Sequence, residues 1–173
     1  MKVLVTSFTP FNKSINNYSK EVLNYIADVD KITVDVVYDK CYLDIINVYN
    51  LDEYDLIIAM GEARMRNVLT LEIEAKNISS CSLTDNSGVL KQNQIIDENL
   101  PSSLKTLVAV DKVKDLVEFS YDAGKFVCNN LYFHLLKNYP EKSLFIHIPN
   151  CNDSKEEYIK YAKSVNNIIK ALS

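Results

Sequence analysis

The sequence predicts a three-layer α/β/α sandwich with a mostly parallel central sheet. Short β-rich runs alternate with helical segments along the chain, which is the pattern of α/β proteins. Two of the runs, "DLIIAM" at 55–60 and "LFIHI" at 144–148, are almost continuously apolar, as are central strands covered on both faces. Since 173 residues suit one hydrophobic core, we expect a single domain over residues 1–173.

Each expected element has its own signal. The run "VLTLEIEA" at 68–75 alternates polar and apolar residues, so we expect a half-exposed strand, antiparallel and near an edge. Segment 84–103 is polar and turn-rich, which predicts a long loop. The expected strands are 2–8, 31–38, 55–60, 68–75, 117–121 and 143–149. The expected helices lie near 17–28, 41–49, 107–116, 129–138 and 153–172.

Composition excludes several classes of protein. Lys and Arg total 19 against 23 acidic residues, so no positive field favours nucleic acid or anionic lipid. No apolar run reaches the roughly 20 residues that span a bilayer, and the amino-terminal run resembles a strand rather than a signal peptide. We therefore expect a soluble, cytoplasmic protein with no nucleic-acid or membrane partner.

The cysteines and histidines favour neither a metal nor a nucleotide. Two histidines cannot build a histidine-rich metal site, and the three glycines form no phosphate-binding motif. The four cysteines are scattered without a C-x-x-C pair, which fits reduced thiols in a cytoplasm: Cys41, Cys81, Cys128 and Cys151. We expect no cofactor and no bound metal.

Cys128 is the candidate nucleophile. It lies in "AGKFVCNN" at 123–130, between a β-like run and an apolar helical run. A helix N-terminus would stabilise a thiolate there and lower the thiol pKa. The alternative is a buried cysteine that serves as one more small apolar side chain.

A cysteine hydrolase also needs an imidazole and a group that orients it. His147 lies near the carboxyl end of a buried strand, where ligands gather in α/β sheets, whereas His134 lies six residues further along the helix of Cys128. A core histidine bonded to backbone is the alternative for His147. Glu72 or Glu74 would supply the carboxylate, and the residues alone do not decide between them.

Six stretches in order resemble the pyroglutamyl peptidase I family of cysteine exopeptidases: "VTSFTPF", "INN", "MGEARMRNVLTLEIEAKN", "TDNSG", "AGKFVCNNLYFHLL" and "FIHIP". The resemblance spans roughly residues 2–149 and implies a catalytic triad. The cysteine of "FVCN" falls on Cys128 and the histidine of "HIP" falls on His147. The glutamate of the family's triad lies at a fixed distance after a glycine that ends a strand. Counting that distance from Gly61 without a gap places this glutamate on Glu72.

The resemblance also implies an activity, which is hydrolysis of the bond after an N-terminal pyroglutamate (5-oxoproline) through thiolate attack and an acyl-enzyme, without a metal. Phe8 and Phe11 match the aromatic residues that line the lactam pocket. Glu62 matches a further substrate-binding position of the family. Asn16 matches another, if one residue is deleted from this chain relative to the family. The partners implied are small pyroglutamyl peptides and a second copy of the chain, in a homo-oligomer such as a dimer or tetramer.

Several positions depart from the family pattern, and they cluster around the expected site. Glu62 replaces a glutamine, and Lys125 replaces a threonine, where it would either lower the thiol pKa or obstruct the pocket. Ser82 replaces an arginine associated with the oxyanion site. The other changed positions are Ser7, Asn12, Lys13, Arg64, Met65 and Ile73. These changes support a second hypothesis, a catalytically weakened relative that binds a peptide or a partner chain.

Overall fold

The central sheet has six strands in the order β2-β1-β3-β8-β4-β7. The computed structural model describes all 173 residues. Strands β2, β1, β3 and β8 run parallel, β4 is antiparallel to β8, and β7 is parallel to β4. The strands are β1 (Val3–Phe8), β2 (Asp30–Val34), β3 (Leu56–Glu62), β4 (Thr70–Glu72), β7 (Glu118–Ser120) and β8 (Ser143–Ile148). The predicted mostly parallel sheet is confirmed.

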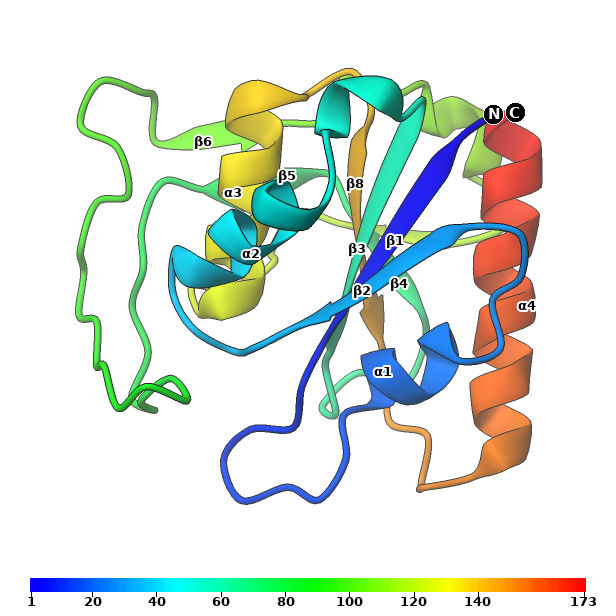
Figure 1. Ribbon diagram of the computed structural model, residues 1–173, viewed down its shortest axis with the longest axis horizontal. Helices are drawn as coiled ribbons and strands as arrows, with labels where there is room; N and C mark the ends of the chain where they lie inside the picture. Colours follow the sequence, from blue (N-terminus) through cyan, green and yellow to red (C-terminus); the bar gives the residue numbers. More distant parts are fainter.

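Helices cover both faces of the sheet, as Figure 1 shows. Helices α1 (Tyr18–Leu23) and α4 (Lys155–Leu172) share one buried apolar cluster with one face. Helices α2 (Lys40–Val48) and α3 (Val127–Asn138) share a second cluster with the opposite face. The predicted three-layer sandwich is therefore confirmed. None of the helices combines the length and apolar character that crossing a bilayer requires.

The expected strand at 68–75 is divided in two. After β4 the chain leaves the main sheet, and β5 (Glu74–Lys76) pairs with β6 (Ser103–Lys105) in a separate two-stranded sheet. The antiparallel pairing of β4 with β8 is as expected. The expected half-exposure of β4 is wrong, because all three of its residues are buried between β8 and the edge strand β7.

The expected helix at 107–116 is also wrong. Only one short turn, Val110–Val113, is helical, and it is a 3₁₀ turn. The Leu107 N–H donates to the Pro140 carbonyl over 2.8 Å, and the Thr106 hydroxyl donates to the Ser143 carbonyl over 2.8 Å. These bonds tie the start of the segment to β8 and to the residues just before it, and the rest of the segment forms short turns. Val113 is buried and Val108 and Val110 are partly buried, without an α-helix.

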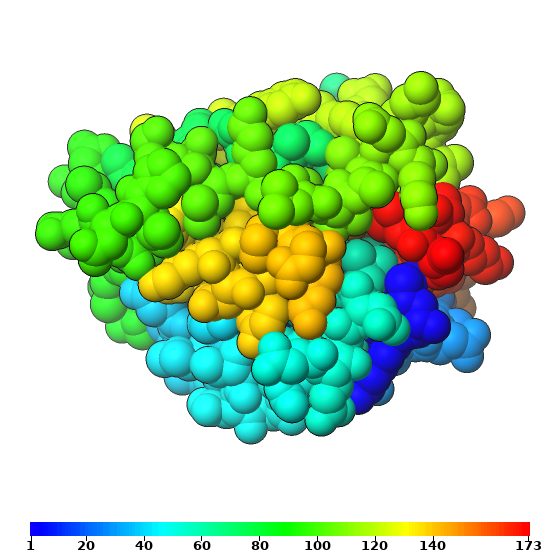
Figure 2. All heavy atoms as spheres, turned by 90° about the horizontal axis from the view of Figure 1, so that it is seen from above, coloured from blue at the N-terminus to red at the C-terminus, as the bar shows by residue number.

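The expected loop at 84–103 has no regular strand or helix before its last residue, Ser103, which begins β6. Its backbone is nevertheless held by one buried side chain, Asn77, whose amide donates to the carbonyls of Asp97, Leu100 and Pro101 over 2.7–3.0 Å. Figure 2 shows this segment in green beside α3 in yellow. The two ends of the chain lie side by side in both views.

Candidate active site

A cavity of about 150 Å³ lies at the carboxyl ends of β1, β3 and β8, beside the N-terminus of α3. Parallel strands bring their carboxyl ends to one edge of a sheet, where α/β proteins bind ligands. The cavity is lined by Phe8, Phe11, Asn17, Val36, Glu62, Ala123, Gly124, Phe126, Cys128 and His147. It therefore brings together five of the residues that the sequence analysis singled out.

Cys128 is the second residue of α3. The chain enters the helix through Gly124, whose φ of 77° lies in the left-handed region that glycine adopts without cost. The N–H groups of Val127, Cys128 and Asn129 donate to no acceptor within the chain. They remain available to an oxygen held at the mouth of the helix.

Gly61 makes room for the thiol. A Cβ atom added at this residue would lie 2.6 Å from Cys128 Sγ and 2.9 Å from Cζ of Phe145, both closer than real contacts allow. Gly61 is the direct neighbour of His147 in the pairing of β3 with β8. The thiol is therefore packed against the strand position beside the imidazole, although no hydrogen bond joins the two side chains.

His147 and Glu72 form a buried pair. The Nδ1 atom of His147 lies 2.7 Å from Oε1 of Glu72. The imidazole is 5% exposed and the carboxylate is fully buried, so solvent does not weaken this contact. Because Nδ1 is engaged with Glu72, Nε2 is the nitrogen free to exchange a proton with another group.

Arg66 completes this network, and the sequence analysis did not single it out. Its Nη1 atom lies 2.6 Å from Oε1 of Glu72 and also donates to the Thr70 hydroxyl. Its Nη2 atom donates to the carbonyl of Asp122 over 2.8 Å, and Asp122 precedes the turn into α3. One side chain thus neutralises Glu72 and holds the segment that leads to Cys128. The available signal was its position within "GEARMRNVLTLE", between Gly61 and Glu72.

The electrostatics of the site correct one expectation. Burial, together with the charges of Glu72 and Glu62, raises the pKa of the Cys128 thiol to about 12, rather than lowering it as the helix N-terminus alone would. Burial also lowers the pKa of His147, although its hydrogen bond with Glu72 opposes that shift. Both shifts favour the uncharged forms of the thiol and the imidazole in the resting site.

Glu72 stays ionised in this setting. Burial raises its pKa, but the hydrogen bond with His147 and the charge of Arg66 together bring the pKa below its ordinary value. An ionised Glu72 is the form that accepts the Nδ1 proton of His147. The buried carboxylate therefore selects the tautomer of His147 whose Nε2 is an acceptor.

Aromatic side chains also line the cavity. Phe8 is 2% exposed, and the ring of Phe11 lies 5.8 Å from that of Phe126 between centroids. Phe126 immediately precedes α3, and the sequence analysis did not select it, although it stands within the quoted stretch around Cys128. The cavity is thus small and largely apolar, and its lining includes a thiol and an imidazole.

The asparagine beside the cavity is Asn17 rather than Asn16. Asn17 lines the cavity, caps α1 by accepting from the Ser19 N–H over 3.0 Å, and donates to the Thr9 carbonyl over 3.1 Å. Asn16 lies outside the lining and donates to Asp153. The resemblance, with one residue deleted, named Asn16 and did not name Asn17.

The loop after β1 retains a left-handed turn without glycines. Asn12 and Lys13 have φ values of 49° and 63°. For residues with a Cβ atom this conformation costs about 1–2 kcal/mol each, and asparagine tolerates it better than most. The loop is held in place by Asn86, whose amide donates to the Pro10 carbonyl over 3.0 Å. The two replacements have therefore not prevented the turn.

Four of the other changed positions do not line the cavity. Lys125 is exposed and lines no part of the cavity, so in the structure it neither blocks the slot nor charges the thiol. Ser82 is exposed and makes no hydrogen bond. Ile73 is buried in the cluster on the α4 side of the sheet. Ser7 is buried and hydrogen-bonded to Thr33 over 2.9 Å.

Two rejected candidates also lie elsewhere. His134 Nε2 is 3.0 Å from Asp39 and its ring stacks on Tyr42, outside the cavity. Glu74 lies on β5 of the second sheet, with Lys105 3.9 Å away. No group of three or more histidine, cysteine or acidic side chains is arranged to hold a metal ion.

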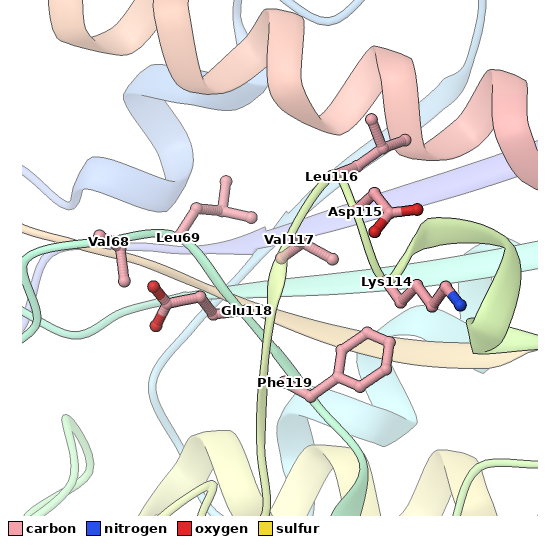
Figure 3. Close-up of a pocket in the computed structure, with 8 residues that line it drawn as sticks. All are labelled: Val68, Leu69, Lys114, Asp115, Leu116, Val117, Glu118 and Phe119. Carbon is pink, nitrogen blue, oxygen red and sulfur yellow. The ribbon is translucent and has the colours of Figure 1, made fainter.

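A larger hollow of about 580 Å³ lies on another part of the surface. Figure 3 shows that its side chains come from two segments, Val68–Leu69 before β4 and 114–119 leading into β7. It is open to solvent and is lined by no cysteine or histidine. The cavity that contains Cys128 is therefore the better candidate for the chemistry.

Comparisons with known proteins agree with this architecture. The family model described as pyroglutamyl peptidase matches residues 1–173. The pyrrolidone-carboxylate peptidase of Thermosipho melanesiensis is 30% identical over 169 residues, covering 86% of this chain and 83% of its own. The enzyme of that name from Staphylococcus aureus strain Newman is 29% identical over 167 residues, covering 86% of this chain and 79% of its own.

Solved structures are similar over nearly the whole chain. The pyrrolidone carboxyl peptidase of Fervidobacterium islandicum superimposes with a TM-score of 0.87 at 24% identity, covering 99% of this chain and 98% of its own. The pyroglutamyl peptidase I of Bacillus amyloliquefaciens superimposes with a TM-score of 0.82 at 24% identity, covering 99% of this chain and 92% of its own. These structures share the fold, and the family match extends from the first residue to the last. The chain therefore belongs to the pyroglutamyl peptidase family.

Proposed function

We propose that this protein is a cysteine exopeptidase that removes an N-terminal pyroglutamyl residue from small peptides. The observation that carries the proposal is the single cavity in which an aromatic slot, the Cys128 thiol and the His147 imidazole meet. The family to which the chain belongs supports the substrate class, and the slot is suited to one small flat ring. Cys128, His147 and Glu72 are the proposed catalytic triad.

In the proposed reaction, Sγ of Cys128 attacks the carbonyl carbon that follows the lactam ring. His147 Nε2 accepts the thiol proton and donates it to the departing amine, which leaves a thioester on Cys128. Water then attacks the thioester with His147 as the base, and pyroglutamate and the free thiol are released. Glu72 holds the imidazole and stabilises it while it is protonated, and Arg66 positions Glu72.

The backbone of α3 is the proposed oxyanion site. The tetrahedral intermediates carry negative charge on the former carbonyl oxygen, and preorganised N–H groups stabilise such charge. The N–H of Cys128 and its neighbours in the first turn have no other acceptor in the chain. They replace, in part, the arginine that the family resemblance aligns with the exposed Ser82.

Phe8, Phe11 and Phe126 are the proposed walls of the lactam pocket, and Asn17 and Glu62 its proposed polar groups. Aromatic rings bury a flat ring with little conformational cost, while the lactam N–H and C=O need partners. The retained pair of His147 and Glu72 favours hydrolysis over the alternative of a weakened peptide-binding relative. No contact in the structure specifically favours the binding role.

The proposed site also suits a reducing compartment, and we place the protein in the cytoplasm. All four cysteines are free, and a thiol nucleophile works only while it stays reduced. The single domain over residues 1–173 and the homo-oligomer remain predictions, and the native mass in solution tests the latter.

The proposal is tested with pyroglutamyl aminomethylcoumarin under reducing conditions. We expect the wild-type protein to release the fluorescent amine from this substrate and to leave glutaminyl aminomethylcoumarin, its open-chain counterpart, nearly untouched. The open chain carries a charged amine that an aromatic slot does not solvate. Equal hydrolysis of both substrates, or no hydrolysis by folded protein, would contradict the proposed substrate class.

A further inference from the structure

Glu62 places a carboxylate in the wall of the cavity. It is the last residue of β3, its side chain is only 3% exposed, and it lines the cavity with Cys128 and His147. A buried charge without a partner is costly, and here it would face an uncharged ring. The carboxylate therefore needs a counter-ion if the cavity is to select an uncharged ligand.

Arg64 supplies that counter-ion from two residues away. Its Nε atom donates to Oε1 of Glu62 over 2.7 Å, and its Nη2 atom donates to Oε2 over 3.3 Å. The backbone N–H of Tyr18 donates to Oε2 over 2.8 Å. Both oxygens of Glu62 are thus engaged by donors, and its negative charge is shared with a guanidinium.

Arg64 is itself held in one place by the first loop and α1. The guanidinium carbon lies 4.4 Å from the centre of the Tyr18 ring, a cation–π contact. Nη2 also donates to Oδ1 of Asn16 over 3.1 Å, and the amide of Asn16 donates to Asp153 over 2.5 Å. Asn16, which does not line the cavity, thus positions Arg64.

We propose that Arg64 is a specificity-determining residue, which neutralises Glu62 so that the cavity prefers a neutral lactam to a cationic ring of the same size. The inference rests on the proposed function, and the competing group is an N-terminal prolyl residue. An N-terminal prolyl residue has the same five-membered ring, but its nitrogen is protonated and the ring carbonyl is missing. Arg64 acts through Glu62 and touches no reacting atom, so it is a positioning residue.

The test is the ratio of kcat/KM for pyroglutamyl to prolyl aminomethylcoumarin in four proteins. Arg64→Met keeps an apolar stem on Tyr18 but removes the charge, and we expect the ratio to fall by about tenfold or more, the effect of roughly 1.4 kcal/mol. Glu62→Gln leaves an unpaired cation beside the ring, so we expect the ratio to rise. The double variant has no charge at either position and returns the ratio to within about threefold of wild type.

The opposite signs separate this role from damage to the fold, since damage lowers both activities together. A ratio unchanged in both single variants, or a double variant as unselective as Arg64→Met, would overturn the inference. Arg64→Lys is the matched control, because it keeps the positive charge while losing the bidentate contact with Glu62. We expect its kcat/KM ratio to lie closer to that of wild type than to that of Arg64→Met. If Arg64→Met does not fold, Glu62→Gln still tests the inference, because its kcat/KM ratio is expected to rise.

Binding separates failure of this inference from failure of the proposed function. Wild type, Arg64→Met and Glu62→Gln are titrated with pyrrolidone and with pyrrolidinium, followed by ligand-observed NMR. If no variant hydrolyses either substrate, the proposed activity fails. The inference then holds only if Arg64→Met shifts preference toward pyrrolidinium and Glu62→Gln shifts it toward pyrrolidone. Equal preferences in the three proteins would overturn it.

Discussion

Replacing Cys128 by alanine is expected to abolish the release of aminomethylcoumarin from the pyroglutamyl substrate, with a loss of at least about 10⁴-fold in kcat/KM. Alanine removes the only thiol in the cavity lining while leaving the aromatic slot intact. Binding should therefore survive the loss of turnover. Steady-state rates and a titration with pyrrolidone, measured on the same preparation, check both halves of this prediction.

Cys81→Ala is the matched control for Cys128→Ala. Both cysteines are free and intermediate in burial, but Cys81 does not line the cavity. We expect the control to keep close to wild-type activity, because surface substitutions away from a site usually change stability by no more than about 0.5 kcal/mol. Full activity in Cys128→Ala, or its loss in Cys81→Ala alone, would mean that the nucleophile has been misassigned.

Replacing Glu72 by glutamine is expected to lower kcat by about 10²–10⁴-fold with little change in KM, by analogy with loss of the orienting carboxylate in other triads. The amide cannot hold His147 in the same tautomer, and it leaves Arg66 without a counter-ion beside the imidazole. Both effects act on proton transfer and neither acts on the lactam slot. Kinetics at saturating and limiting substrate separate kcat from KM.

The same variant has an expected pH signature. The negative charge of Glu72 raises the pKa of His147, and the charge of Arg66 lowers it. Without Glu72 the pKa of His147 therefore falls, so the neutral, base-competent imidazole persists to lower pH. The acidic limb of the kcat/KM profile should move to lower pH in Glu72→Gln.

Glu74→Gln is the control for this prediction, since Glu74 is the other glutamate of the same stretch and lies on β5. It makes no contact with His147, and we expect its rate and its pH profile to match wild type. An acidic limb that moves upward in Glu72→Gln, or one that moves in Glu74→Gln instead, would contradict the assignment of the orienting carboxylate.

The sequence predicted those parts of the fold that depend on local pattern. The apolar runs of β3 and β8 indicated central strands, and the strand, glycine turn and helix around Cys128 indicated a group at the edge of the sheet. His147 was placed at the carboxyl end of its strand for the same reason. These features depend on residues close together in the chain, so periodicity and turn chemistry suffice to predict them.

The remaining features depend on contacts between distant segments. Glu72 and Glu74 are indistinguishable by strand alternation, and they differ because the chain leaves the main sheet between them. The raised pKa of Cys128 follows from burial and two carboxylates on other strands, which no local rule predicts. Segment 107–116 has helical spacing, yet it forms only short turns, and bonds from Thr106 and Leu107 tie its start to β8 and to the residues just before β8.

Arg66 and Arg64 show the same limit within one short stretch. Both lie between Gly61 and Glu72, but Arg66 pairs with the carboxylate beside His147 and Arg64 pairs with the carboxylate in the cavity wall. Sequence spacing alone does not assign either partner. Glu62 and Arg64 both depart from the family pattern. In the structure they form an ion pair, where that pattern has uncharged residues.

The central claim, that Cys128 attacks the carbonyl of a bound pyroglutamyl group, is tested most directly by affinity labelling with the chloromethyl ketone of pyroglutamic acid. In this reaction the thiol sulfur forms a bond to carbon and chloride leaves. We expect one label per chain on the peptide that contains Cys128, activity lost in parallel, and slower labelling in the presence of pyrrolidone. Labelling of Cys41, Cys81 or Cys151 instead, or no labelling of Cys128 in active protein, would contradict it.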